Sequence, residues 1–186
     1  MSENTKNFRE LEKKYLVTIS KPNLRRLISR LRNKTETPSD YVEAKTYDTY
    51  WDGKTPNQFL RLRHSRGKDG EGKRSLKELT AKSKDKRSNV DRLEVNAPAE
   101  ELRLLRKALT VALGEPTCRL YKKEHVFWMP DRTVISLCQI KSKLYLEVEA
   151  GSLSRVQKWF RYVSKLSVPF TLTPEPRSLY EIYCRS

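Results

Sequence analysis

The chain of 186 residues is poor in the residues that build disulfide frameworks and zinc sites. It has three cysteines, none in a CxxC pair, and two histidines, so spaced thiol and imidazole ligands for zinc are missing. No apolar run approaches the roughly 20 residues that a membrane span needs. An odd cysteine count without a secretory leader predicts reduced thiols, a cytoplasmic location and no membrane partner.

Acidic residues are also in deficit, since 23 Asp and Glu stand against 39 Lys and Arg, a formal net charge of +16. Such an excess favours an anionic partner, such as a phosphate compound, a nucleotide or a nucleic acid. A basic surface without a dedicated ligand explains the composition equally well. The length suits one domain with a real core, and we expect a single domain over residues 1–186.

Three segments have the apolar spacing of amphipathic helices, with basic residues on the other side. They are residues 21–33, 98–114 and 152–166. The second begins with Pro98 and ends at Gly114, which are typical start and stop residues. Eight segments are predicted as strands: about 10–19, 42–51, 58–66, 75–84, 90–96, 117–128, 132–140 and 143–150. This order predicts an α+β fold on a mostly antiparallel sheet.

Several of these strands alternate charged and apolar side chains. Arg61 and Arg63 share one face of their strand, and Glu147 and Glu149 share one face of theirs. One arrangement is an open sheet with a solvated polar face. The other is a closed barrel with the helices outside and the charged faces inside, where about eight strands can enclose a small ligand. An interior that holds both acids and guanidinium groups suits a metal-bound polyanion.

Seven segments, in order, carry a resemblance to a known family. The stretch "ELEKK" at 10–14 matches an E-x-E-x-K signature. The other segments are "TYDTYWDG", "FLRLR", "ELTAKSK", "DRLEV", "LYLEVEAG" and "EPRSLYEIY". Together they resemble the CYTH domain, or triphosphate tunnel metalloenzyme, superfamily over almost the whole chain.

The resemblance implies an eight-stranded antiparallel closed barrel that binds a triphosphate lengthwise, with Mg²⁺ or Mn²⁺ as cofactor. The residues implied to be catalytic are Glu10, Glu12, Lys14, Glu147 and Glu149. The expected metal ligands are Glu10, Glu12, Glu147, Glu149 and Glu94. The expected phosphate-binding residues are Arg61, Arg63, Lys82, Lys84, Arg92 and Lys123. Arginine can grip phosphate oxygens bidentately, and Mg²⁺ prefers carboxylate and phosphate oxygens.

The chain departs from the family pattern at three places. Cys138 stands where a metal-binding Asp is common, and a thiol is a poor Mg²⁺ ligand. Asn96 replaces the last acid of an R-x-E-x-E strand. The sixth strand usually carries K-x-R, and that register would give Lys122 and Glu124, a reversal of charge. We therefore expect a shift of one residue that turns Lys123 inward, which needs a bulge or an altered turn.

Three functions fit this pattern. The first is a metal-dependent hydrolase of tripolyphosphate, a nucleoside triphosphate, thiamine triphosphate or the triphosphate end of RNA. The second is a class IV adenylyl cyclase, which the tail "EPRSLYEIY" resembles. The third is a non-catalytic protein that binds phosphates or RNA 5′ ends, which the charge of +16 also suits. The sequence leaves the substrate open, as well as the choice between monomer and homodimer.

Overall fold

The computed structural model describes the backbone of residues 8–53, 58–84 and 91–185, and the side chains of 11–53, 58–82 and 98–185. Within these residues nine strands form one antiparallel sheet in the order β5-β4-β3-β2-β6-β7-β8-β1-β9. The strands are β1 Phe8–Ile19, β2 Tyr41–Asp52, β3 Gln58–Lys68, β4 Lys73–Lys84, β5 Asp91–Pro98, β6 Cys118–Trp128, β7 Val134–Ile140, β8 Lys143–Ala150 and β9 Phe170–Pro174. A short 3₁₀ helix, Pro38–Asp40, precedes β2.

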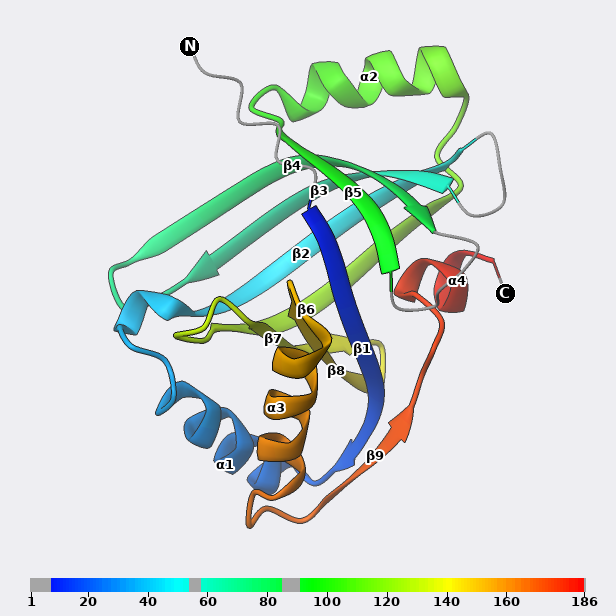
Figure 1. The fold of residues 1–186 in the computed structure, drawn as a ribbon. Helices are drawn as coiled ribbons and strands as arrows, with labels where there is room; N and C mark the ends of the chain where they lie inside the picture. The colour runs from blue at the N-terminus through cyan, green and yellow to red at the C-terminus, as the bar shows by residue number, and fades with distance from the viewer. Residues whose placement is uncertain (1–7, 54–57, 85–90, 186) are drawn as a thin grey trace.

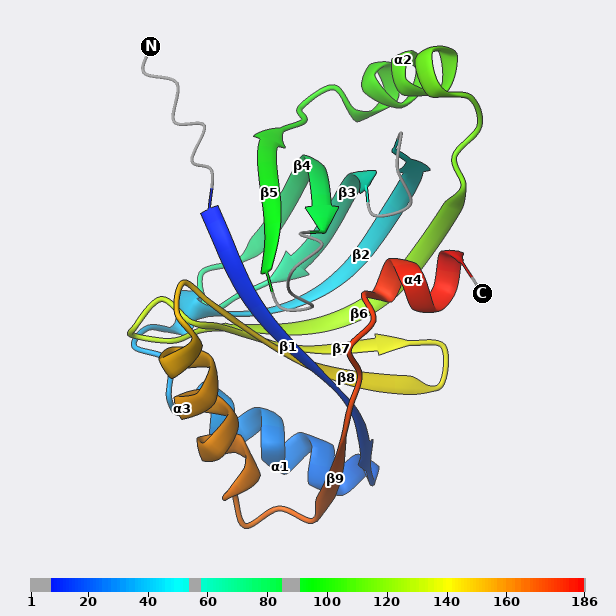
Figure 2. The same ribbon diagram turned by 45° about the vertical axis from the view of Figure 1, so that its right-hand side comes forward.

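Strand β1 closes the sheet into a barrel, because it pairs along both of its edges. One edge pairs with β8 over residues 11–17. The other edge pairs with β5 over residues 8–11 and then with β9 over residues 15–19. The pairing of β1 with β5 completes a ring of eight strands, which Figures 1 and 2 show as a curled wall. Strand β9 lies outside this ring. The predicted antiparallel barrel is therefore confirmed, whereas β9 was not predicted.

The amphipathic helices lie outside the barrel, as predicted (Figure 1). Helices α1, Lys21–Arg32, and α3, Leu153–Ser164, bury their apolar sides against the outer faces of β1, β7 and β8. Helix α2, Leu102–Leu113, packs over Trp51 and Leu62 on the other side. It begins later than the predicted Pro98, because Pro98 is the last residue of β5. None of the helices described is long and apolar enough to cross a membrane.

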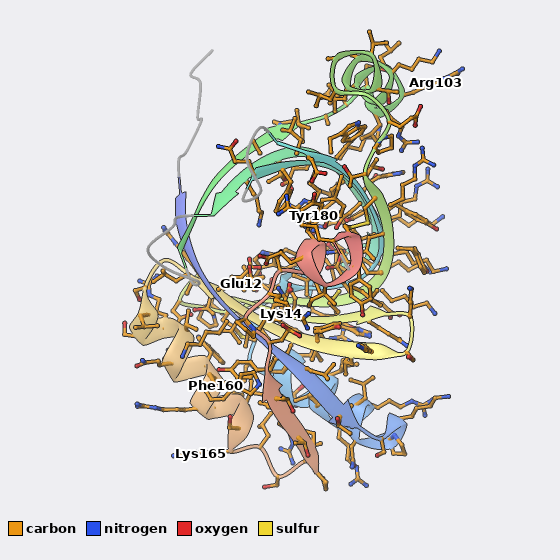
Figure 3. All side chains as sticks on the ribbon, turned by 90° about the vertical axis from the view of Figure 1, so that its right-hand side faces the viewer. Glu12, Lys14, Arg103, Phe160, Lys165 and Tyr180 are labelled. Atoms are coloured by element: carbon orange, nitrogen blue, oxygen red, sulfur yellow. A yellow bond between two sulfur atoms is a disulfide. The ribbon has the colours of Figure 1, made fainter. Side chains whose placement is uncertain are left out.

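The last helix, α4 Leu179–Cys184, fills part of one end of the barrel (Figure 3). Its residues Leu179 and Tyr180 pack in an apolar cluster with Tyr50, Leu120 and Tyr145. At this end of the barrel the inward-pointing side chains of the strands are apolar, and α4 covers them. Ser178 starts the helix with a capping box to Glu181.

A disulfide joins Cys118, at the start of β6, to Cys184, at the end of α4. The two Cα atoms lie 5.4 Å apart, within the range of natural disulfides. Cys138 is buried in the same apolar cluster and has a free thiol. The prediction that all three cysteines are reduced is therefore wrong for this structure, because the tail folds back and brings the first and last cysteines together.

Candidate metal and phosphate site

Three carboxylates meet inside the barrel where β1 and β8 pair. Glu12 stands opposite Glu149 in the register, and Lys14 stands opposite Glu147. Because alternate strand residues share a face, all four side chains point to the interior. One oxygen from each of the three acids lies within 4.8 Å of the others. The predicted E-x-E pairs are thus brought together, as far as their described residues go.

Lys14 lies between two of these acids and is 7% exposed. Its Nζ is 2.7 Å from Glu12 Oε1 and 2.9 Å from Glu147 Oε1. Lys14 thus lies between two of the acids, while one oxygen from each of the three carboxylates stays close enough to the others to share one ion. Oxygen donors in such a group are what Mg²⁺ and Mn²⁺ prefer, and the site therefore fits the expected ion. Ser136 of β7, opposite Glu147 in the register, adds a hydroxyl to this wall.

The predicted arginines line the same cavity from β3. Arg63 donates from Nε to Asp48 Oδ1 at 2.9 Å and from Nη2 to Asp48 Oδ2 at 3.2 Å. Arg61 is 7% exposed and donates from Nη2 to Glu78 at 3.1 Å and to Thr80 at 2.9 Å. Lys82 of β4 also lines the cavity. These contacts hold the guanidinium planes in fixed directions before a ligand arrives.

A second ion cluster, not predicted from the sequence, joins β2 to β6. Lys122 Nζ lies 3.3 Å from Asp48 Oδ2 and 2.7 Å from Glu124 Oε1. Burial would raise the pKa of Asp48, but the cations Arg63, Lys122 and Arg61 hold it well below its usual value. Burial and Arg63 would lower the pKa of Lys122, but Asp48 and Glu124 hold it above its usual value. All of these groups are therefore charged at neutral pH.

The placement of Lys123 is a correction to the sequence prediction. Lys122 and Glu124 point inward and are 3% and 7% exposed, while Lys123 is exposed on the outer face. Strand β6 pairs with β2 without a bulge, so no shift of register occurs. The reversal of charge is tolerated because Glu124 is held by Lys122, and Lys122 also by Asp48 of β2. The alternation in "TYDTY" predicts that Asp48 points inward, and the family register predicts the same for Lys122 and Glu124.

The cavity has a volume of about 480 Å³, and the charge of its described lining is nearly balanced. Its described lining has six cationic and five acidic side chains, and the buried Asp48 offsets the remaining cation. The cations are Lys14, Arg61, Arg63, Arg74, Lys82 and Lys122, and the acids are Glu12, Glu78, Glu124, Glu147 and Glu149. A triphosphate carries about four negative charges, which need fixed positive charge once water is removed. A divalent ion on the three carboxylates would supply part of it.

The two ends of the cavity differ from its charged centre. Away from α4 the lining is mostly apolar, although Arg74 and Ser65 also belong to it, and Trp128 is 41% exposed there. The apolar residues of that end are Val42, Ala44, Leu76, Val126, Trp128 and Val134. Near α4 the lining is aromatic, with Tyr50, Phe59 and Tyr180 in mutual ring contact. Inorganic polyphosphate has no apolar group that could pack against either surface.

Four predicted site residues have side chains outside the described residues: Glu10, Lys84, Arg92 and Glu94. Their backbones show that Glu10 stands opposite Arg92, and that Lys82 stands opposite Glu94. Their roles stay predictions. Cys138 does not reach the three carboxylates as an Asp substitute, because it is fully buried in the apolar cluster under α4.

The described residues thus form a closed antiparallel barrel with both acids and cations on its inner face. No family model matches the chain, and no curated protein matches it in sequence. Solved structures with the same fold include a protein from Pyrococcus horikoshii, with a TM-score of 0.67, 16% identity, and coverage of 94% of this chain and 99% of that one.

Two other structures with this fold have been described by function. A proposed adenylate cyclase from Vibrio parahaemolyticus has a TM-score of 0.63, 17% identity, and coverage of 95% and 98% of the two chains. A proposed adenylyl cyclase from Hippeastrum, described as having a dominant triphosphatase activity, has a TM-score of 0.61, 13% identity, and coverage of 93% and 94%. These likenesses show the fold alone, and it is an antiparallel barrel of the kind that the sequence resemblance implies.

Proposed function

We propose that this protein is a divalent-metal-dependent hydrolase that removes the terminal phosphate of a triphosphate. The observation that carries the proposal is the cluster of Glu12, Glu147 and Glu149 in one cavity with the inward-facing cations of β1, β3, β4 and β6. Carboxylates beside a phosphate would repel it unless a cation lay between them. The triphosphatase activity described for the Hippeastrum protein, which has the same fold, supports this choice.

We assign each residue a role from its position in the barrel wall. The three glutamates would hold Mg²⁺ or Mn²⁺, which when bound neutralises phosphate charge and polarises the reacting phosphoryl group. Arg61 and Arg63, oriented by Glu78 and Asp48, would bind the phosphate oxygens. Lys14 would stabilise the negative charge that develops on the phosphate next to the acids. Glu10, Lys84, Arg92 and Glu94 are proposed for the same roles from the sequence alone.

The test is a substrate panel with Mg²⁺ and with Mn²⁺. It contains tripolyphosphate, ATP, GTP, thiamine triphosphate and RNA with a 5′-triphosphate, and the readout is released phosphate. We expect release from at least one of them that chelation abolishes and that Glu147→Gln lowers by about 100-fold or more, because a ligand carboxylate is lost. Glu43→Gln, on the exposed outer face of β2, is the matched control. Binding without turnover of any substrate would instead support a phosphate-binding protein.

The apolar end of the cavity favours a triphosphate that carries an organic group. Val42, Val126 and Val134 line this end together with Trp128. An aromatic or sugar-linked group can stack on an exposed indole, which inorganic phosphate cannot do. We therefore expect a nucleoside or thiamine triphosphate to be a better substrate than tripolyphosphate.

Trp128→Ala tests this preference. It should lower kcat/KM for the best organic triphosphate by about tenfold, because stacking on an aromatic side chain contributes about 1–3 kcal/mol. The value for tripolyphosphate should stay unchanged. An equal loss for both substrates would mean that Trp128 supports the wall rather than the ligand, and the preference would be withdrawn while the hydrolase proposal stands.

A cyclase is the second candidate, because the same apolar end could hold a purine. The Vibrio parahaemolyticus structure, described as a proposed adenylate cyclase, shares the fold. Analysis of the products from ATP separates the two. Cyclic AMP and pyrophosphate would overturn the hydrolase proposal, whereas ADP and phosphate would exclude the cyclase.

A further inference from the structure

An exposed aromatic pair lies on the outer face of the barrel between α2 and α1. Tyr47 of β2 and Tyr121 of β6 are direct partners in the sheet register, and their ring centroids lie 4.9 Å apart. Tyr47 is 51% exposed and Tyr121 is 41% exposed. Large aromatic side chains on a sheet usually face a helix or a core. Among the described residues no helix packs over either ring, so about half of each side chain is available to a partner in solution.

A row of cations crosses the sheet directly beside this pair. Arg66 of β3, Lys45 of β2 and Lys123 of β6 occupy successive partner positions on three neighbouring strands, and all three are exposed. Within the described part of the chain none of them forms an ion pair with a carboxylate. Like charges at directly opposed strand positions repel. The row therefore favours a bound polyanion over solvent alone.

Further cations surround the aromatic pair. Arg119 is exposed on β6, two residues before Tyr121 and therefore on the same face, and its Nη2 lies 4.0 Å from Oε2 of the exposed Glu115. His64, the other strand partner of Tyr47, has a pKa that is lowered by burial and then by Arg66, Lys77 and Arg106. The three cations named among these causes add positive charge near this face. The acid nearest in the strand pattern, Glu43, lies beyond the cation row from the tyrosines.

We propose that this outer platform, defined as Lys45, Tyr47, Arg66, Arg119, Tyr121 and Lys123, binds single-stranded nucleic acid. Exposed aromatic rings on the surface of a sheet can stack unpaired bases, and the flanking Lys and Arg can contact the phosphates between them. A duplex keeps its base faces stacked inside and cannot use the rings in this way. The chemistry thus selects a strand with accessible bases.

The platform is separate from the tunnel and does not depend on triphosphate hydrolysis. Figure 3 shows Glu12 and Lys14 inside the ring of strands, while nitrogen-tipped side chains project from the outer wall below α2. Tyr47 and Tyr121 alternate along their strands with the inward-facing Asp48 and Lys122. The two sites therefore lie on opposite faces of the same strands, and they can be tested one at a time.

The test uses a fluorescent RNA of about ten nucleotides, within the site size of such surfaces. Its 5′ end is a hydroxyl, and EDTA is present, so the tunnel contributes neither a triphosphate nor a metal contact. Binding is followed by anisotropy. The pair Tyr47→Ala and Tyr121→Ala should weaken binding by about tenfold or more, because base stacking is lost. The pair Tyr47→Phe and Tyr121→Phe should retain it, since both rings remain.

The cation row is tested by its salt dependence. The pair Lys45→Gln and Lys123→Gln should reduce the slope of log K against log salt by about 1.4, because two phosphate contacts are lost from a single strand. The matched control is Lys21→Gln with Lys165→Gln, which removes the same charge from exposed positions at α1 and at the end of α3. We expect the control to bind RNA as the wild type does.

Several outcomes would overturn the proposal. Equal weakening by the control pair would mean that net charge alone attracts RNA. A loss in the Phe pair as large as in the Ala pair would mean that the rings do not stack bases. A duplex that binds as tightly as the single strand would exclude base stacking as well. A DNA strand of the same sequence separates general single-strand binding, with equal affinity, from recognition of ribose hydroxyls, and either result leaves the platform standing.

Discussion

At the scale of single residues, the main feature of the barrel interior is its buried charged side chains. Asp48, Lys122, Arg63 and Glu124 lie in the wall with at most a fifth of their side chains exposed. Isolated ions in such a place would be very unfavourable, and each is held here by at least one opposite charge in hydrogen-bond range. Removing one member leaves its partners buried without compensation.

Asp48→Asn should therefore lower the free energy of unfolding by about 3–5 kcal/mol at neutral pH, because Arg63 and Lys122 lose their shared anion. The folded-state pKa of Asp48 is depressed, so its contribution is complete above its ordinary value of 3.8 and is lost as the pH falls further. Urea unfolding at pH 7 and at pH 3 measures both effects. Glu36→Gln, at an exposed position, should change neither. An equal loss in that control would argue against a local cause.

Residue patterns predicted much of the acid site and less of its surroundings. Two E-x-E pairs on strands that must meet in a closed barrel predict a carboxylate cluster, and Glu12, Glu147 and Glu149 form one. The inward direction of Lys122 and Glu124 was missed, because Glu124 stands where the family pattern has a cation, and this reversal of charge favoured a shifted register. Asp48, the further partner of Lys122, lies on a strand more than seventy residues earlier. Only the register between β2 and β6 brings it close.

At the scale of elements, long periodic segments were predicted well and short ones were not. The helices α1, α2 and α3 and all eight barrel strands occur close to their expected bounds. Strand β9 has five residues and α4 has six, which is too short for a period to be visible. Their positions depend on contacts with β1 and with the end of the barrel. The disulfide depends on the same contacts and was therefore missed too.

The disulfide between β6 and α4 should stabilise the closed end of the barrel. It joins residues 66 positions apart, for which the chain-entropy estimate is about 4 kcal/mol. Thermal unfolding of the wild type should therefore occur at a lower temperature with a reductant than without one. Cys184→Ser should melt at the lower temperature in both conditions. If the melting temperature of the wild type is the same with and without the reductant, the disulfide does not form in solution.

At the scale of the whole molecule, the excess positive charge lies on the outside. The chain carries a net charge of +16, whereas the described lining of the cavity is almost balanced between cations and acids. The outer surface can therefore attract anions from a distance, while the described lining has little net charge with which to attract a polyanion. We infer that residues 1–186 act as one domain in this division.

This division predicts linked binding of metal and triphosphate. Mg²⁺ with tripolyphosphate should raise the melting temperature by more than the sum of the two separate shifts, since each supplies the charge that the other lacks. At about 100 times the dissociation constant the pair should add about 2.7 kcal/mol to the stability. Differential scanning fluorimetry measures this, and Glu147→Gln should abolish the excess over the sum. Purely additive shifts in the wild type would contradict a shared site.

The pairing of β1 along both edges has a consequence for synthesis of the chain. All three partners of this strand follow it in sequence, and one long edge is unpaired until β8, residues 143–150, has been made. A nascent chain therefore exposes the apolar side chains of Tyr15 and Val17 on an open strand for most of its translation. Closing the ring requires contacts between residues far apart in sequence, which form slowly. Yield in the cell should consequently depend on holding chaperones, more than the stability of the finished barrel would suggest.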